Sequence, residues 1–141
     1  MAPASTVSPG SVDSFAKLAE FIQEARVGMF TTATVDGLLH SRPLVTRQVD
    51  AAGNALWFFA ASNFDKAEAI LDDKEVVVAY AAPDQKGYVS VSGRAHVVHD
   101  HAKAEELWTP MAATRFPKSA DDPRLVLLRV DVESVEYWDA P

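Results

Sequence analysis

Several residues in this chain have the side-chain types that bind an aromatic ligand carrying a phosphate group. They are an arginine beside a proline, a run of large aromatics, a lysine and a tryptophan, namely Arg42-Pro43-Leu44, Trp57-Phe58-Phe59, Lys66 and Trp108. Arginine donates paired hydrogen bonds to phosphate or to the polar edge of a ring. Aromatic side chains offer an apolar slot for a flat ligand. The alternative, that the aromatics form the core and Arg42 is a surface charge, stays open from these residues alone.

The stretch from Leu56 to Ile70 links the aromatics to the lysine. It starts as an apolar strand, breaks at Ser62-Asn63, and continues with the three- and four-residue apolar spacing of a helix. Ser and Asn cap helices well, and the free N–H groups of a helix start attract anions such as phosphate. Lys66 in the first turn adds a positive charge. The plainer interpretation is a core strand, a capped helix and a solvated lysine.

The sequence lacks the residue patterns that disulfides, hydrolase active sites and metal sites require. The chain has no cysteine, which excludes disulfides, thiolate zinc sites and a cysteine nucleophile. Ser62 lacks the glycine-flanked setting of a hydrolase serine. His96, His99 and His101 are close in sequence, but His96 and His99 are an odd number of residues apart and point to opposite faces of a strand. We therefore predict no metal site, and the sequence identifies no catalytic residue.

Composition limits the partners and the organisation. The chain has 141 residues, a net charge of −7 and 48% hydrophobic residues, which suit one globular domain. The negative charge argues against nucleic acid and anionic membranes as partners. No apolar run approaches the ~20 residues of a membrane helix. We expect residues 1–12 to be a flexible leader, residues 13–141 to form a single domain, and the protein to be cytoplasmic.

Periodicity and turn residues predict a mainly β domain with flanking helices. Asp36-Gly37 is typical of a two-residue hairpin turn, Pro43 predicts an edge, bulge or bend, and Gly93 predicts a bend in a long strand. The hairpin-like spacing favours an antiparallel barrel with helices at its ends. The expected elements are a helix at 15–25, strands at 29–35, 38–49 and 56–61, a helix at 64–72, strands at 76–80 and 88–98, a helix from Asp100 through Met111, a loop at 116–123, and one or two strands at 125–130 and 135–138.

An ordered set of short motifs runs from about Ser14 to Asp139. The set is Gly28-Met29-Phe30-Thr31-Thr32, Ser41-Arg42-Pro43-Leu44, Leu56-Trp57-Phe58-Phe59, Lys66-Ala67-Glu68-Ala69-Ile70, Tyr88 to Ala95, Glu106 to Met111, Asp122-Pro123, Leu125 to Val130 and Glu136 to Asp139. In this the chain resembles the general stress protein 26 group of the pyridoxamine 5'-phosphate oxidase-like, FMN-binding split barrels. Each motif is weak alone, and their order is specific.

The resemblance implies an α+β fold with a six-stranded antiparallel split barrel that forms a homodimer. It implies a flavin, FMN in the first place, in each of two clefts at the dimer interface. The implied flavin-binding residues are Arg42, Pro43, Leu44 and Val45 along the ring and its polar edge, Trp57, Phe58, Phe59 and Ala60 in the strand beneath it, Ser62 and Lys66 at the phosphate, and Tyr88 and Trp108 from the partner subunit.

One departure from the family bears on the ligand. Relatives commonly have a serine two residues before the lysine, where this chain has Phe64, and Asp65 follows it. A carboxylate repels phosphate, so FAD and riboflavin are expected ligands beside FMN. The resemblance implies a flavin-binding general stress protein, with flavin-dependent oxidoreduction left open. Pyridoxamine 5'-phosphate oxidase activity is not expected, because the chain closes on acidic residues instead of the longer basic segment of active relatives. The alternative is a dimeric split-barrel module for another planar ligand, without redox activity.

Overall fold

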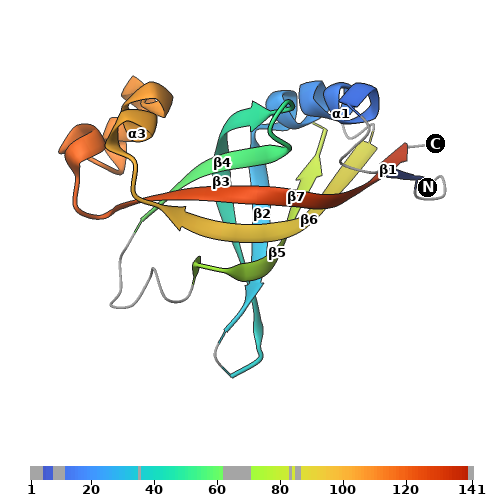
Figure 1. Cartoon of the computed structure of the whole chain (residues 1–141), viewed down its shortest axis with the longest axis horizontal. Helices are drawn as coiled ribbons and strands as arrows, with labels where there is room; N and C mark the ends of the chain where they lie inside the picture. The colour runs from blue at the N-terminus through green and yellow to red at the C-terminus, as the bar shows by residue number, and fades with distance from the viewer. Residues whose placement is uncertain are drawn as a thin grey trace.

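A closed barrel of antiparallel strands forms the body of the molecule (Figure 1). The computed structural model describes residues 5–7, 12–34, 36–61, 71–82, 84 and 87–139. Its elements are β1 (Ser5–Val7), α1 (Val12–Ala25), β2 (Val27–Ala33), β3 (Leu39–Asp50), β4 (Ala55–Ala61), β5 (Lys74–Ala81), β6 (Gly87–Val98), α3 (His101–Leu107), η1 (Pro110–Thr114), η2 (Ser119–Asp121) and β7 (Leu125–Asp139). The helix expected at 64–72 lies outside the described residues except for Leu71, which is helical, and Asp72, which lies in a turn.

The strand order is β7-β4-β3-β2-β5-β6, and β6 pairs back with β7. The predicted six-stranded antiparallel barrel is therefore confirmed, and β1 is added beside the far end of β7. The chain from 125 to 139 forms one long strand, whose first part pairs with β4 and which pairs with β6 over most of its length. A strand flanked on both edges satisfies its backbone hydrogen bonds and closes the sheet.

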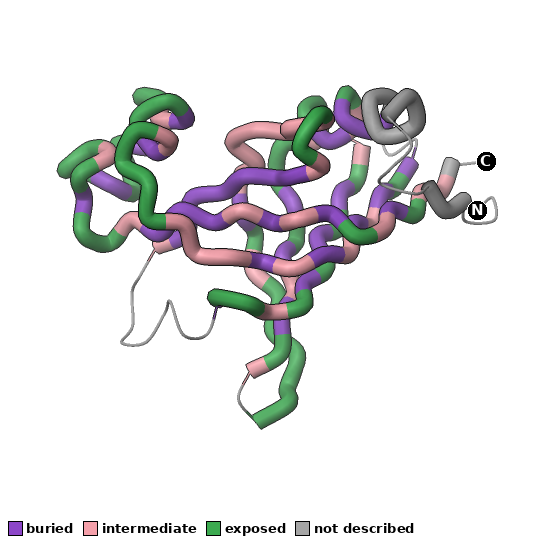
Figure 2. The backbone as a smooth tube through the Cα atoms, viewed as in Figure 1, coloured by how far each residue is buried: buried purple, intermediate pink, exposed green. Residues whose placement is uncertain are grey.

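Strand β4 separates two hydrophobic cores. Leu56, Phe58 and Ala60 face the barrel interior, where α1 contributes Leu18 and Ile22. The alternate residues Trp57 and Phe59 face outward into a second core under α3 and the two 3-10 turns, completed by Ala104, Leu107, Ala112, Phe116 and Leu127. This burial on both faces explains why β4 is apolar throughout, and Figure 2 shows it as an almost unbroken buried segment.

Two expected boundaries are wrong. The helix expected to reach Met111 ends at Leu107, because Pro110 disfavours helical geometry in the residue before it; Pro110 then starts η1. Asp100 caps this helix as expected, accepting a hydrogen bond from the Lys103 N–H at 3.1 Å. The hairpin at Asp36-Gly37 is also longer than two residues: the last β2–β3 pair is Ala33 with Leu39, and the Thr34 N–H then donates to the Leu38 carbonyl at 2.7 Å. The expected loop at 116–123 contains the short turn η2.

The bend expected at Gly93 is present as a shift in the β6–β7 register between Ser92 and Gly93. A Cβ atom at Gly93 would lie 2.2 Å from the Asp131 carbonyl oxygen. Ser92 pairs with Ser134 and Gly93 with Val132, so the extra residue of this bulge is Glu133 in β7. A bulge increases the bend and twist of the strand that carries it. Only glycine fits this approach of two backbones.

We expect Gly93→Ala to lower the free energy of unfolding by about 2 kcal/mol, since the added methyl forces two paired backbones apart. Urea denaturation followed by circular dichroism measures this. The matched control is Ser92→Ala, which changes the neighbouring residue without crowding β7. Equal stability of the two variants would contradict the close packing at Gly93.

The Asp122 carboxylate stabilises the segment between η2 and β7 by hydrogen bonds to Lys118 and Arg124. This carboxylate is buried and accepts hydrogen bonds from the Arg124 backbone N–H at 2.9 Å, from the Lys118 N–H at 3.2 Å and from the Arg124 guanidinium at 3.3 Å. The Arg124 side chain, followed by the Arg124 and Lys118 backbone N–H groups, lowers the pKa of Asp122 to about 2. The charged form is therefore favoured in the folded chain.

A carboxyl pKa that is lower in the folded than in the unfolded chain stabilises the fold above the ordinary pKa and loses this effect as the pH falls. We expect Asp122→Asn to unfold more easily than the parent near neutral pH. The difference should shrink as the pH falls from 3.8 to about 2. Denaturant midpoints across this range measure it, and a difference independent of pH would contradict the assigned pKa.

Candidate functional site

The barrel opens where β3 and β4 part. Thr46 with Phe58 is the last pair between the two strands, and the register shifts between Thr46 and Gln48. Beyond this pair, in the described part of the chain, β3 from Leu39 to Val45 pairs only with β2. The edge position predicted for Pro43, which has no N–H to donate, is confirmed. The free edge of β3 leaves backbone groups for a ligand to contact.

The predicted residues of β3 differ in exposure. Arg42 is half-buried, Pro43 is exposed, and Leu44 is buried within the barrel core. Side chains alternate along a strand, so Arg42 leaves the sheet on the same face as Leu44, whereas Pro43 and Val45 leave it on the outer face. A ligand on this edge therefore meets the backbone together with Pro43 and Val45.

The predicted aromatics of β4 are packed inside the protein. Phe58 and Ala60 belong to the barrel core, and Trp57 and Phe59 to the second core. Lys103 Nζ lies 4.8 Å from the centre of the Trp57 ring, and the indole Nε1 is buried without a partner. The described structure of β4 therefore presents no open aromatic face.

Trp108 and Tyr88, the two residues expected to come from the partner subunit, lie in different parts of the fold. Trp108 packs on Phe59 of its own chain, with ring centres 6.3 Å apart. Tyr88 is exposed at the start of β6, and β2 and β5 lie between β6 and β3 in the sheet. Within a single chain, Tyr88 therefore does not lie at the free edge of β3. Ser62 and Lys66, together with Phe64 and Asp65, lie outside the described residues.

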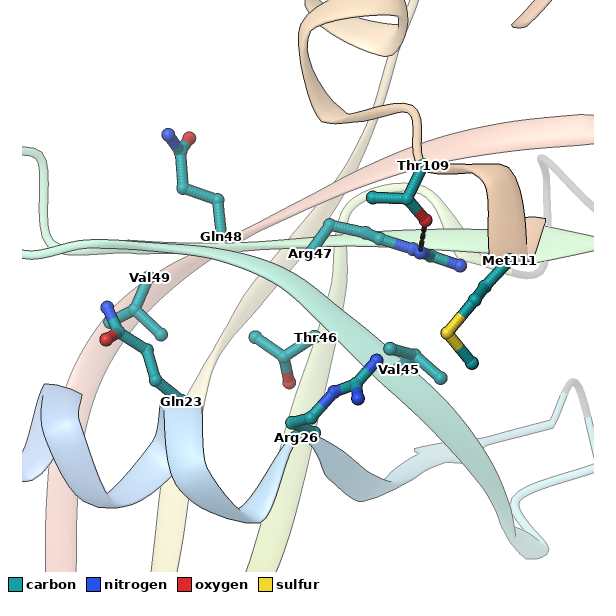
Figure 3. A pocket seen from close by; sticks show the side chains of 9 residues that line it. All are labelled: Gln23, Arg26, Val45, Thr46, Arg47, Gln48, Val49, Thr109 and Met111. Carbon is teal, nitrogen blue, oxygen red and sulfur yellow. Dashed lines mark hydrogen bonds between the residues drawn. The ribbon is translucent and has the colours of Figure 1, made fainter. Parts of the chain in front are cut away.

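A pocket of about 510 Å³ begins at Val45, where the predicted ligand strand ends (Figure 3). A space of this size holds a small molecule. Three elements bring its residues together: the end of α1, the middle of β3, and the start of η1. The lining residues are Gln23, Arg26, Val45, Thr46, Arg47, Gln48, Val49, Thr109 and Met111.

Arg47 reaches into the pocket from the bulge in β3. Its guanidinium lies 4.9 Å from the centre of the Phe59 ring, and one terminal N–H group donates to Thr109 Oγ1 at 3.1 Å. Its Nε is buried and has no hydrogen-bond partner. Burial, followed by the charges of Arg26 and Arg115, lowers the pKa of Arg47. The pocket thus carries positive charge that is incompletely compensated by the protein.

Arg26 enters the same pocket from the end of α1 with a positive φ of 64°, which is unusual for a residue with a side chain. Its carbonyl accepts a hydrogen bond from the Thr46 N–H at 2.8 Å. The Thr46 hydroxyl is in turn bonded to the Tyr80 phenol at 2.7 Å, and burial raises the pKa of Tyr80, which keeps the phenol neutral. These bonds fix Arg26 beside the bulge that presents Arg47.

Arg26, Arg47 and Thr109 are not among the site residues predicted from the sequence. They lie far apart in the chain, and neither the positive φ nor the bulge has a sequence signal, because both occur at ordinary residue types. Two histidines have carboxylate partners: His96 Nε2 lies 3.1 Å from Asp131, and His101 Nε2 lies 2.9 Å from Glu105 and 3.2 Å from Asp121. Among the described residues, no three potential metal ligands come together, and no helix is long and apolar enough to cross a membrane.

Solved structures share this fold. The general stress FMN/FAD binding protein of Xanthomonas citri is 26% identical, with a TM-score of 0.75 over 89% of this chain and 87% of that one. A putative general stress family protein of Xanthomonas campestris is 25% identical, with a TM-score of 0.77 over 96% and 91%. The General Stress Protein 26 of Bacillus anthracis is 22% identical, with a TM-score of 0.73 over 91% and 95%. The resemblance to this group is confirmed.

The family assignment rests on nearly the whole domain. No match was found among curated proteins. The model of the family described as "Pyridoxamine 5'-phosphate oxidase like" matches residues 13–141. This range contains the barrel, the free edge of β3 and the pocket beside it. The chain therefore belongs to the pyridoxamine 5'-phosphate oxidase like family.

Proposed function

We propose that this chain is a flavin-binding protein that holds the flavin ring along the free edge of β3. The observation that carries the proposal is the parting of β3 from β4 beyond Thr46 and Phe58, which leaves residues 42–45 paired on one edge only within the described chain. The family membership and the similarity to an FMN/FAD binding protein support the same ligand class.

The chemistry of the ring fits this edge. An isoalloxazine has carbonyls and ring nitrogens along one side, and the free backbone groups of Arg42 to Val45 provide matching donors and acceptors. Pro43 and Val45 provide apolar contact on the outer face. Ser62 and Lys66 remain the proposed phosphate contacts on sequence grounds. When bound, a flavin supplies hydride or single-electron transfer, and the protein positions and tunes it.

The pocket beside Val45 supports an oxidoreductase over a carrier. A redox enzyme needs space for a second reactant next to the flavin, and the pocket gives about 510 Å³ at the end of the proposed ring site. Bleaching of bound flavin by NADH or NADPH, followed by reoxidation with an added acceptor, would distinguish a reductase from a carrier. Pyridoxamine 5'-phosphate oxidase activity is not part of the proposal.

We expect the purified protein, mixed with excess FMN and desalted, to retain the near-ultraviolet and blue absorption bands of a bound flavin. Lys66→Ala should weaken FMN more than riboflavin, since only FMN carries a phosphate, and Arg42→Ala should weaken both. Arg94→Ala is the matched control, because Arg94 pairs with Asp73 and Glu75 away from this edge. Absence of retained flavin would instead favour a split-barrel module without redox activity.

The relative affinities for FMN and riboflavin test whether Phe64 and Asp65, where this chain departs from the family pattern, weaken phosphate binding. Because Asp65 repels phosphate, we propose that the ring contributes most of the affinity and that FMN, FAD and riboflavin all bind. Similar dissociation constants for FMN and riboflavin are expected from fluorescence titration. A large preference for FMN would show that the phosphate is held strongly despite these residues.

A homodimer is part of the proposed function. Apolar side chains are exposed on neighbouring strands of the outer barrel face: Val27 (49%), Met29 (43%) and Val77 (39%) on β2 and β5, and Leu39 (74%) on β3. Exposed apolar area of this kind marks association surfaces. A second copy on this face would lie next to Pro43, which pairs with Met29, and would close the flavin site from outside.

We expect the parent to sediment as a dimer and Met29→Lys to sediment as a monomer with an unchanged β-sheet circular dichroism spectrum. The lysine places a charge where the partner would bury an apolar contact. Flavin retention should fall in parallel. The control Ala102→Lys adds the same charge on the exposed side of α3, and an unchanged dimer in Met29→Lys would exclude this face as the interface.

A further inference from the structure

One methionine in the described part of the chain has most of its side chain in solvent. The chain contains no cysteine, so Met1, Met29 and Met111 carry its only sulfur atoms. Met1 lies outside the described residues. Met29 is 43% exposed and belongs to the face proposed for the dimer, whereas Met111 is 69% exposed and lies in η1. Oxidation of a thioether depends on its exposure, so Met111 is the described sulfur most open to a peroxide.

The backbone at Met111 is fixed although its side chain is exposed. Pro110 precedes it with a restricted φ, and the Thr114 hydroxyl donates to the Met111 carbonyl at 3.0 Å. Ala112, the next residue, is buried in the second core and anchors the turn. The turn therefore holds the thioether at the wall of the pocket. Figure 3 shows the Met111 side chain reaching into this space on the same side as the Arg47 guanidinium.

The pocket that Met111 lines contains hydrogen-bond donors that lack acceptors. A guanidinium has five N–H groups, and in Arg47 one terminal nitrogen donates to Thr109 while the buried Nε has no partner among the described residues. Within the same residues, Arg26 and Arg47 form no ion pair. A thioether sulfur is a weak acceptor and leaves these donors unsatisfied. A sulfoxide oxygen carries partial negative charge and accepts strongly, so oxidation turns Met111 into a partner for Arg47.

We propose that hydrogen peroxide oxidises Met111 and that the resulting sulfoxide bonds to Arg47 and closes the pocket. In this step Met111 Sδ attacks one oxygen of the peroxide, so an S–O bond forms and the O–O bond breaks. The sulfur loses two electrons, and the leaving hydroxide takes the proton of the transferred hydroxyl group to give water. The flexible side chain then crosses the pocket, and its oxygen accepts free N–H groups of Arg47. A methionine sulfoxide reductase reopens the pocket by reducing the sulfoxide.

Closure changes which molecules reach the space beside Val45. The pocket adjoins the edge proposed for the flavin ring, so closure keeps a second reactant away from a bound flavin; this consequence rests on the proposed function. The oxidation and the closure themselves depend on Met111 and Arg47. Both are therefore tested on the full chain without flavin, where failure of the flavin proposal has no effect.

The first measurement is the order in which the methionines are oxidised. The purified chain is treated with hydrogen peroxide and digested with trypsin, and the fragments are analysed by mass spectrometry. Fragment 104–115 contains Met111 and fragment 27–47 contains Met29, so an added oxygen is assigned to each residue separately. We expect Met111 to be oxidised about twofold faster than Met29, or more. Equal rates, or faster oxidation of Met29, overturn the assignment to Met111.

The second measurement is the reactivity of Arg47 before and after oxidation. Phenylglyoxal modifies guanidinium groups that it can reach, and mass spectrometry gives the rate at each arginine. Peroxide treatment should slow the modification of Arg47 about threefold or more, because the sulfoxide covers the guanidinium and occupies its N–H groups. Arg94 is the internal control, since it pairs with Asp73 and Glu75 and should react as before. An unchanged rate at Arg47 in the chain oxidised at Met111 overturns the closure.

Two substitutions separate the closure from general oxidative damage. Met111→Leu keeps an apolar side chain without sulfur, so peroxide should no longer slow the modification of Arg47. Met111→Gln carries an amide oxygen, a strong acceptor, on a side chain of similar length and should slow it without peroxide. Circular dichroism establishes that both variants are folded, as expected for changes at an exposed side chain. A peroxide effect on Arg47 that persists in Met111→Leu overturns the role of Met111.

Discussion

Closure of the sheet through β7 is the constraint on which the rest of the structure depends. This strand is bonded to β4 on one edge and to β6 on the other, and it thereby joins the two ends of the sheet. In this closure β6 and β7 approach each other closely at Gly93, where the absence of a side chain leaves room for the Asp131 carbonyl of β7. Once the barrel is closed, its interior is filled by side chains from every strand, and α1 covers one end of it.

A closed barrel leaves few backbone groups without partners. The free backbone groups where β3 and β4 part are therefore the ones available to a ligand. Here β3 and β4 run together only from Thr46 to Asp50 on the β3 side. β4 packs against a core on each face and stays paired with β7 as far as Ala61, whereas β3 stays paired with β2 as far as Leu39. The free edge of β3 lies where these two pairings diverge. The proposed flavin site uses this edge, and the aromatics of β4 fix its position without contacting solvent.

The bulge at the end of the β3–β4 ladder links the proposed flavin edge to the arginine pocket. It lets Arg47 lie over Phe59 and reach Thr109, which comes from the segment after α3. The cap formed by α3, η1 and η2 therefore completes the pocket as well as covering Trp57 and Phe59. Covering these aromatics buries apolar area, and the same contacts place a positive group next to the site proposed for the ring.

The sequence predicts the antiparallel barrel, the positions of most strands along the chain, an irregularity at Gly93 and an edge, bulge or bend at Pro43, because periodicity, turn residues and the lack of a proline N–H act locally. It also identified the family through motifs in order. It did not reveal that Trp57 and Phe59 lie in a second core, that α3 ends before Trp108, or that Arg26 and Arg47 line one pocket. These features depend on which distant segments cover a given face and on backbone geometry at residues that have no special local preference, so no local pattern predicts them.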